Sequence, residues 1–234
     1  MTLLSNRELE SSDVVANCVM NRERRLRGTN GYDRELGLDI AQFLLSKIAS
    51  KAHVAWLDLC CGEGFALEEA AGLFRLQNLL NQVCLTGVDL VGGWALRDAT
   101  RDVEFVQASL DTWTPDRDYD LITCVHGLHY IGDKLALIRN AASSLKGTGC
   151  FVANLDLANL HVIDCLHGQR AIIAKLKTVG VRYDSHTKVL RCDGNTAFDL
   201  PFRYVGADDQ TGPNYTGQPA VTSHYVALHG ATDA

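Results

Sequence analysis

Little in the chain is suited to a flexible linker, a membrane span or an export signal. Only four of the 234 residues are proline, which leaves little material for a disordered linker between domains. No segment offers the roughly 18 uninterrupted apolar residues of a membrane-spanning helix, and Met1 to Glu10 lacks the basic start and apolar run of a secretory signal. We therefore expect a cytoplasmic protein that is folded almost throughout and makes no membrane contact.

An excess of positive charge is also missing from the sequence. The formal net charge is −6 at neutral pH. Binding to a nucleic-acid backbone relies on basic patches, so this balance disfavours a nucleic-acid partner. The arginine-rich stretch from Asn21 to Arg27 is most simply a solvated helical face, because charged residues at helical spacing usually face water.

The cysteines lack the pairing that marks a metal or redox site. There are eight of them, with no CxxC pair, and several lie inside apolar runs, where free cysteine behaves as a small buried hydrophobe. His161, Asp164, Cys165 and His167 have ligand-type side chains. If these four residues lie on one helix, their spacing does not place them on the same face, so we expect no metal site. We also expect the thiols to be reduced.

The length and pattern of the chain predict one domain, since α/β folds commonly reach this size undivided. Residues 1–50 are expected to form an N-terminal helical arm or lid, with a helix from Ile40 after the N-cap Asp39. Residues 51–234 are expected to form an α/β core. A loop at 206–220 is rich in turn formers, and a loop this long in a compact domain is usually functional or mobile, although a surface loop without function is the alternative.

Apolar runs alternate with amphipathic segments along the core, which is typical of a parallel sheet covered by helices on both faces. The predicted strands are Val54 to Leu59, Cys84 to Asp89, Val103 to Gln107, Asp120 to Val125, Cys150 to Leu155, Lys188 to Cys192 and Ser223 to Leu228. The predicted helices are Phe65 to Leu80, Trp94 to Thr100, Asp133 to Leu145 and Val162 to Val179. The fold class is therefore α/β, with a doubly wound, seven-stranded, mostly parallel sheet.

A glycine turn follows the first strand, in the stretch Asp58-Leu59-Cys60-Cys61-Gly62-Glu63-Gly64. Gly62 and Gly64 can adopt backbone angles closed to other residues and let a ligand approach without meeting a Cβ atom. The helix that begins near Phe65 directs its unpaired amides and positive dipole end at the same place. A ligand that carries a nucleotide-like group is expected here, although a tight turn without a ligand is the simpler alternative.

An acidic residue closes the next strand. Asp89 lies twenty-five residues beyond Gly64, where its carboxylate can accept two hydrogen bonds from ribose hydroxyls. With this pair of features the sequence resembles the class I S-adenosylmethionine-dependent methyltransferases. The resemblance runs from about Leu38 to Leu155, and it implies that S-adenosylmethionine is the cofactor and that the last strand of the sheet is antiparallel.

The resemblance also assigns cofactor contacts, and it does so residue by residue. Ser109 stands where many members of the family carry an aspartate facing the adenine amino group, and its hydroxyl can still accept that bond. The N-terminal arm is a lid by position, in which Tyr32 or Arg34 touches the methionine moiety or an anionic substrate. The complete set of implied cofactor-binding residues is Tyr32, Arg34, Asp58, Cys60, Cys61, Gly62, Gly64, Asp89, Leu90, Ser109, Leu110 and Val125.

A nicotinamide-dependent oxidoreductase is the closest rival interpretation, because it also uses a glycine turn and a ribose-binding acid. Its Gly-x-Gly-x-x-Gly fingerprint needs glycines at Cys60, Gly62 and Phe65, and only Gly62 fits. A protein that binds the sulfonium cofactor without methylating, either as an enzyme or as a binding protein, is a further alternative. The interpretation that we adopt is methyl transfer to oxygen, nitrogen or carbon of a small molecule.

The candidate catalytic residues follow the fourth strand, where the family places the methyl group near the acceptor. His126 directly follows Val125 and can orient or deprotonate a substrate hydroxyl or amine, with His129 and Tyr130 one helical turn or less away. In-line transfer from a sulfonium depends largely on alignment, and a base is needed only if the acceptor carries a proton of high pKa. Leu128-His129 is alternatively a packing pair.

Overall fold

The computed structural model describes residues 3–16, 23–51, 53–92, 94 and 102–228. Seven strands form the main sheet, in the order β3-β2-β1-β4-β5-β8-β7. They are β1 (Val54–Leu59), β2 (Val83–Asp89), β3 (Glu104–Gln107), β4 (Tyr119–Cys124), β5 (Leu145–Asn154), β7 (Val181–Asp184) and β8 (Val189–Asp193). The neighbouring strands β3, β2, β1, β4 and β5 are parallel to one another, and β8 is antiparallel to β5. The predicted fold class, an α/β protein with a seven-stranded, mostly parallel sheet, is confirmed.

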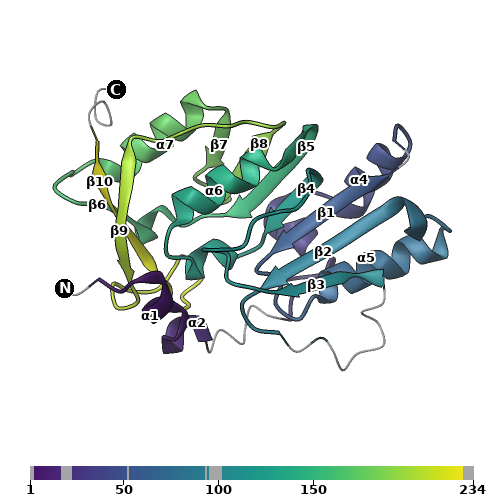
Figure 1. Cartoon of the computed structure of the whole chain (residues 1–234), viewed down its shortest axis with the longest axis horizontal. Helices are drawn as coiled ribbons and strands as arrows, with labels where there is room; N and C mark the ends of the chain where they lie inside the picture. The colour runs from purple at the N-terminus through teal and green to yellow at the C-terminus, as the bar shows by residue number, and fades with distance from the viewer. Residues whose placement is uncertain (1–2, 17–22, 52, 93, 95–101, 229–234) are drawn as a thin grey trace.

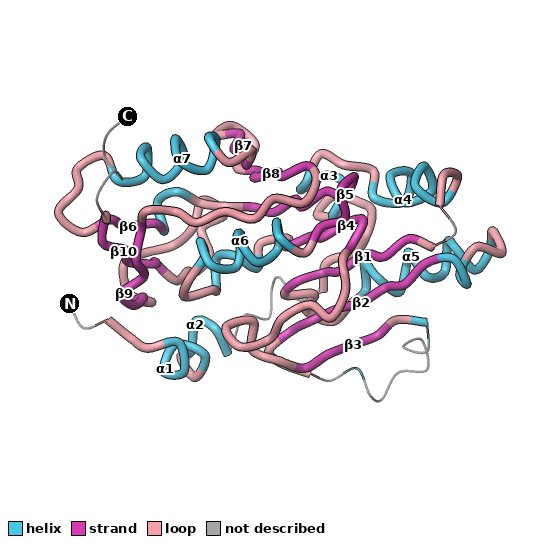
Figure 2. Tube along the Cα trace, turned by 45° about the horizontal axis from the view of Figure 1, so that its top comes forward, coloured by secondary structure: helices cyan, strands magenta, loops and turns pink. Residues whose placement is uncertain are grey.

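Helices cover both faces of this sheet, because the central strands are apolar on both sides. In β1, Ala55, Leu57 and Leu59 belong to one buried cluster, whereas Val54 and Trp56 belong to the other. The first cluster is covered by α6 (Lys134–Ser143) and α7 (Gly168–Thr178). The second is covered by α3 (Tyr32–Leu36), α4 (Ile40–Ile48) and α5 (Phe65–Leu76) (Figure 2). Two cores, one on each face, therefore hold the sheet rigid.

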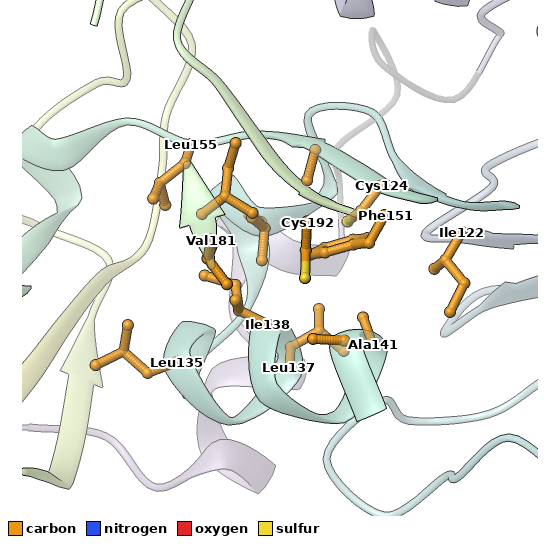
Figure 3. Packing of buried hydrophobic residues seen from close by; sticks show 14 of the residues in the cluster. Ile122, Cys124, Leu135, Leu137, Ile138, Ala141, Phe151, Leu155, Val181 and Cys192 are labelled. Atoms are coloured by element: carbon orange, nitrogen blue, oxygen red, sulfur yellow. The ribbon is translucent and has the colours of Figure 1, made fainter. Parts of the chain in front are cut away.

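The core on the α6 face consists of side chains that are almost completely buried. Figure 3 shows Ile138 and Ala141 of α6 pointing toward Phe151 of β5 and Cys192 of β8, and all four side chains are at most 2% exposed. Burial of each large side chain of this kind contributes about 1.5 to 3 kcal/mol relative to an exposed one. Packing of α6 thus fixes the carboxyl ends of β4 and β5 relative to each other.

The last third of the chain departs from the predicted elements. A second sheet contains β6 (Leu160–Val162), β10 (Thr222–Ala227) and β9 (Phe202–Asp208), in the order β6-β10-β9. The strand predicted at Ser223 exists, but it pairs with β6 and β9 rather than with the main sheet. The place at the edge of the main sheet is taken by β7, which forms a hairpin with β8 and was not predicted.

Other boundaries are corrected in the same region. The helix predicted from Val162 begins only at Gly168, because 160–162 form the short strand β6. The predicted loop 206–220 begins inside β9, which ends at Asp208. Most of the helix predicted at Trp94 to Thr100 lies outside the described residues.

A buried lysine joins the second sheet to the main one. The Nζ atom of Lys134, at the start of α6, donates to the carbonyl oxygens of Ile131 and Val221 and to Ser223 Oγ at 2.8–2.9 Å. Burial lowers the pKa of Lys134 to about 7. These three bonds fix the segment before β10 against the end of β4.

The N-terminal arm begins with two short helices, α1 (Asn6–Glu10) and α2 (Asp13–Ala16). Ser5 and Glu8 form a capping box at the start of α1, which satisfies two of its unpaired amides. Leu9 is 2% exposed and packs with Ala207 and Val221. Figure 1 shows both helices beside β9, on the side toward which the arrowheads of β1 and β2 point.

Candidate functional site

A cavity that is open to solvent lies at the carboxyl ends of β1, β2 and β4. Its walls come from the turns after these strands, from the loop after β3, from α6 and from the N-terminal arm. A crevice at this edge is the expected ligand position in an open α/β sheet. The predicted residues that line it are Cys60, Gly62, Asp89, Leu90, Leu110, Val125, His126 and Tyr130.

The turn after β1 is held by its neighbours on both sides. Cys60 and Gly62 adopt φ angles of 57° and 58°, in the left-handed region that glycine adopts without strain. The amide of Gly62 donates to Asp89 Oδ2 at 2.9 Å, and its carbonyl accepts from the indole of Trp94 at 2.9 Å. The turn therefore presents a fixed backbone surface to the cavity.

Gly64 and Cys61 serve packing instead of the cavity. A Cβ atom on Gly64 would overlap the ring of Phe105 in β3, and Cys61 is buried against Gly87 of β2. Neither residue lines the cavity among the described residues. We expected Gly64 to let a ligand approach closely, but the ring of Phe105 occupies that space.

Asp89 ends β2 with its carboxylate at the cavity wall. Oδ2 accepts from Gly62 as described, and Oδ1 accepts from the amide of Val91 at 2.9 Å. A carboxylate oxygen has two lone pairs and can accept more than one hydrogen bond. The carboxylate is thus oriented by the backbone and suited to a vicinal diol.

Asp58 and Tyr32 lie behind the turn and outside the cavity lining. Asp58 is 0% exposed, and its two oxygens accept from Thr123 Oγ1 at 2.6 Å and from the Tyr32 hydroxyl at 2.8 Å. Burial raises the pKa of Asp58 to about 7. This pair joins α3 to β1, so its contact with a ligand is indirect at most.

Arg34 faces away from the site. Its guanidinium donates to the carbonyl of Thr29 at 3.4 Å, and the residue is exposed. Successive helical residues are about 100° apart, so in α3 the inward face carries Tyr32, Glu35 and Leu36. The expected inward contact at Arg34 is therefore corrected to the neighbouring Glu35.

The loop after β3 is in contact with the N-terminal arm. The hydroxyl of Ser109 donates to Glu10 Oε1, and the amide side chain of Asn6 donates to Asp111 Oδ1. Asn6, Leu9, Glu10 and Val15 of the arm line the cavity beside Leu110. Ser109 itself is behind this wall, and a carboxylate, Glu10, stands in front of its hydroxyl. Sequence reasoning missed Glu10.

The turn after β4 packs directly on the glycine turn. A Cβ atom on Gly127 would lie 2.5 Å from Cys60 Cβ and 2.7 Å from Cys124 Sγ. His126, between β4 and the short 3-10 helix η5 (Gly127–Tyr130), adopts a φ of 57°. Such backbone angles are uncommon in non-glycine residues and tend to occur at functional sites.

The side chain of His126 meets a carboxylate from the arm. Its Nε2 lies 3.0 Å from Glu35 Oε2, and Arg24 lies 3.1 Å from Glu35 Oε1. The hydrogen bond from His126 lowers the pKa of Glu35. Asn154, at the end of β5, accepts from the His126 amide at 3.3 Å and donates to the Glu35 carbonyl at 3.2 Å. None of Arg24, Glu35 and Asn154 was predicted.

His129 and Tyr215 complete this cluster. The His129 ring lies 5.4 Å from the rings of both His126 and Tyr215, between centroids. Burial lowers the pKa of His129 well below its usual value, so its imidazole is neutral. Tyr215, from the late loop, is held by a bond from its amide to Asp156 Oδ2 at 2.6 Å. Tyr215 thus brings the late loop into contact with His126 and His129.

Three further observations concern metals, thiols and membranes. In the described ranges, no three metal-ligating side chains gather, and His161 packs against the ring of His224 at 5.0 Å. The seven cysteines that the structure describes are free, and Cys18 lies outside the described residues. Within the described helices, none has the length and hydropathy to cross a bilayer.

Comparison with known proteins gives a family match. A family model described as a methyltransferase domain matches residues 28–176, well over half of the 234 residues. No curated protein matches the chain in sequence. The family match spans the glycine turn, the end of β2 and the turn after β4.

Several solved structures are similar to the chain. The plantazolicin methyltransferase BpumL, in complex with SAH, is 18% identical over 63% of this chain and 50% of its own, with a TM-score of 0.39. The N-methyltransferase NodS from Bradyrhizobium japonicum WM9 is 17% identical over 81% of this chain and 97% of its own, with a TM-score of 0.46. An amino pentose methyltransferase from Micromonospora echinaspora is 20% identical over 50% of this chain and 48% of its own, at 0.40. The part that matches this chain is thus about half of the length of BpumL.

Proposed function

This chain belongs to the methyltransferase domain family, and from that membership we propose that it transfers the methyl group of S-adenosylmethionine to a small-molecule acceptor. The acceptor atom is oxygen, nitrogen or carbon. The observation that carries the proposal is the cavity in which the glycine turn of Gly62 and the carboxylate of Asp89 meet. This combination suits a nucleoside at the carboxyl ends of the strands.

The residues around the cavity fit the adenosine part of such a cofactor. Asp89 is oriented by two amides and can accept from both ribose hydroxyls. Leu90, Leu110 and Val125 provide apolar wall for a planar base. The cofactor supplies an activated methyl group on a positively charged sulfur, and the protein supplies alignment, which is worth several kcal/mol in a displacement reaction.

Glu10 takes the role that the resemblance assigned to Ser109. The Ser109 hydroxyl already donates to Glu10, and Glu10 lines the cavity. A carboxylate that accepts one hydrogen bond keeps acceptor capacity for an exocyclic amino group. In this proposal the arm is a lid, and Asn6, Leu9 and Val15 close the cavity around the base.

The chemistry takes place next to His126, with Tyr130 in the same wall. His129 lies behind His126 and stays neutral, so we assign it to shaping the site. The acceptor is a small molecule that enters past Tyr215, which is 39% exposed. Neither a nucleic acid nor a membrane is a partner in this proposal.

The test is a transfer assay with a methyl-tritiated donor and a small-molecule extract from cells. We expect label in the extract together with S-adenosylhomocysteine in equal amount, and neither product with Asp89→Ala at a donor concentration near the wild-type KM. A protein that binds the donor and forms no S-adenosylhomocysteine with any extract would contradict methyl transfer. In that case a binding protein or a different reaction is the correct assignment.

A further inference from the structure

A carboxylate and an imidazole form a pair at the border of the cavity. Glu35 Oε2 lies 3.0 Å from His126 Nε2, and His126 is 1% exposed. Glu35 belongs to α3 and His126 to the turn after β4, so residues far apart in the chain build the pair. We refer to Glu35 and His126 as the dyad.

Backbone contacts hold the two partners of the dyad in register. Asn154 is 0% exposed and bonds to the His126 amide with its oxygen and to the Glu35 carbonyl with its nitrogen. Arg24 contacts the other carboxylate oxygen of Glu35 at 3.1 Å. Groups that are fixed in this way lose little entropy when they act, which is the arrangement that acid–base catalysis requires.

The orientation of the imidazole leaves one ring nitrogen available. An ionised carboxylate only accepts hydrogen bonds, so the partner Nε2 carries the hydrogen and Nδ1 carries the lone pair. His126 Nδ1 is buried and has no hydrogen-bond partner among the described residues, and His126 lines the cavity. A buried acceptor of this kind is costly unless a bound molecule satisfies it.

We propose that the dyad is the general base of the reaction and that the acceptor is a compound with a neutral hydroxyl group, whose proton is taken by His126 Nδ1. This inference rests on the proposed function, since it names the acceptor class of the same site. His126 is then a catalytic residue. Glu35 is a positioning residue that selects the tautomer and stabilises the imidazolium.

The surroundings of the dyad and its role as a base favour a hydroxyl over an amine. The groups that face the imidazole are Glu35, His129 and Tyr215, and Arg24 faces Glu35. His129 is neutral, and burial raises the pKa of Tyr215, which keeps its phenol protonated. Arg24 balances the charge of Glu35. The base itself favours a hydroxyl, because a neutral amine attacks without first losing a proton whereas a hydroxyl acceptor needs a group that takes its proton.

The step balances without any additional reactant. The acceptor O–H bond breaks as its proton passes to His126 Nδ1, and the oxygen forms a bond to the methyl carbon. The carbon–sulfur bond breaks, and its electron pair stays on sulfur, which becomes an uncharged thioether. The imidazolium, paired with Glu35, then releases its proton to water.

The tautomer of His126 tests the dyad without an acceptor. We expect ¹⁵N NMR of the S-adenosylhomocysteine complex to show His126 with hydrogen on Nε2 and none on Nδ1, with the signal assigned by its loss in His126→Asn. In Glu35→Gln we expect a mixture of tautomers, whereas Glu104→Gln, on the exposed outer strand, leaves the signal unchanged. A hydrogen on Nδ1 in the wild type would overturn the proposal.

Kinetics with matched acceptors test the hydroxyl class. The probes are phenol, benzyl alcohol and catechol, each compared with the amine of the same skeleton, in the presence of methyl-tritiated donor. We expect label on hydroxyl compounds, a loss of about a hundredfold or more in kcat with His126→Asn, and about tenfold or more with Glu35→Gln. The KM for the donor stays within about twofold, because neither residue belongs to the adenosine-binding wall.

Each outcome has one meaning. Label on the amines alone, or on none of the compounds, would overturn the hydroxyl class, and an unchanged kcat in Glu35→Gln would overturn the dyad. Failure of the proposed function looks different, because the wild-type protein would then form no S-adenosylhomocysteine from the labelled donor with any extract. Transfer of label to an extract compound together with a failed dyad leaves the methyltransferase assignment intact.

Discussion

The two sides of the cavity are built in different ways. The cofactor side, with Cys60, Gly62 and Asp89, comes from two neighbouring strands joined by α5. The acceptor side has His126 in the cavity wall. His126 contacts Glu35 of α3 and Tyr215 of the late loop, which do not line the cavity themselves. A strand, turn and helix that follow one another in the sequence therefore form the proposed cofactor side, whereas tertiary packing forms the proposed acceptor side.

The same contrast holds for the carboxylates on the two sides. Asp58 on the cofactor side is fully buried with two neutral donors, and burial raises its pKa. Glu35 on the acceptor side contacts His126 and Arg24, and the bond from His126 lowers its pKa. One carboxylate tends to hold a proton near neutral pH, while the other stays ionised and can support a proton transfer nearby.

The largest predicted effect concerns Asp58 and pH. In the unfolded chain this group ionises near pH 4, so between about pH 4 and its folded pKa of about 7 the folded state alone keeps the proton. Stability from this group is present at acidic pH and is lost as the pH rises through about 7. Relative to wild type, the free energy of unfolding of Asp58→Asn is expected to rise by on the order of 3 kcal/mol across this interval.

Urea unfolding of both proteins from pH 4.5 to 8 measures this difference. Asp118→Asn, an exposed residue just before β4, is the matched control and is expected to follow wild type. If the difference in free energy of unfolding between Asp58→Asn and wild type does not change with pH, Asp58 is ionised throughout this range, as Glu35 is.

The next effect is the loss of cofactor affinity in Asp89→Ala. Removal of a charged acceptor that pairs with hydroxyl groups costs about 1.5 to 3 kcal/mol, or about ten- to a hundredfold in Kd. Calorimetric titration with S-adenosylhomocysteine measures the change, and Asp199→Ala, with a 94% exposed side chain, is the control. If Asp89→Ala and the control bind S-adenosylhomocysteine with equal affinity, the ribose does not bind at Asp89.

Asn154→Ala is expected to weaken catalysis on the acceptor side and to leave cofactor binding unchanged. Its side chain bridges the backbones of His126 and Glu35, and no other described wall of the cavity depends on it. We expect kcat to fall about tenfold, which corresponds to one lost hydrogen bond to each partner, while the Kd for S-adenosylhomocysteine stays unchanged. Asn81→Ala, an exposed residue before β2, is the control and is expected to change neither constant. Weaker binding of S-adenosylhomocysteine by Asn154→Ala would show that the two sides are not independent.

The smallest effect is expected for the arm. Glu10→Gln keeps the shape of the side chain and removes its charge, so we expect the Kd for S-adenosylhomocysteine to rise about three- to tenfold. The Kd for the analogue of S-adenosylhomocysteine whose purine lacks the amino group is expected to be equal in both proteins. If Glu10→Gln binds both ligands like wild type, the arm covers the cavity without contacting the base.

The cofactor side was largely predictable because its chemistry follows from local spacing. The strand before Cys60, the left-handed turn and Asp89 at the end of β2 are each properties of a few consecutive residues. Gly64 was an exception, since the same residue type serves either a ligand or a packed ring, and only the position of Phe105 decides between them.

The acceptor side and the second sheet were not predictable to the same degree. Arg34 was assigned from its position relative to the family, whereas the phase of a five-residue helix places Glu35 inward. The three-residue strand β6 and the four-residue strand β7 are too short for a clear alternation, and both exist because longer partners pair with them. Asn154 was visible only as a polar residue ending an apolar strand.

Calorimetric titration of the wild-type protein with S-adenosylhomocysteine, and separately with NADH, tests the central claim most directly. Because the cavity combines the turn at Gly62 with Asp89 and lacks a third glycine at Phe65, we predict saturable one-to-one binding of S-adenosylhomocysteine and no heat from NADH. Binding of NADH with no binding of S-adenosylhomocysteine would contradict the account.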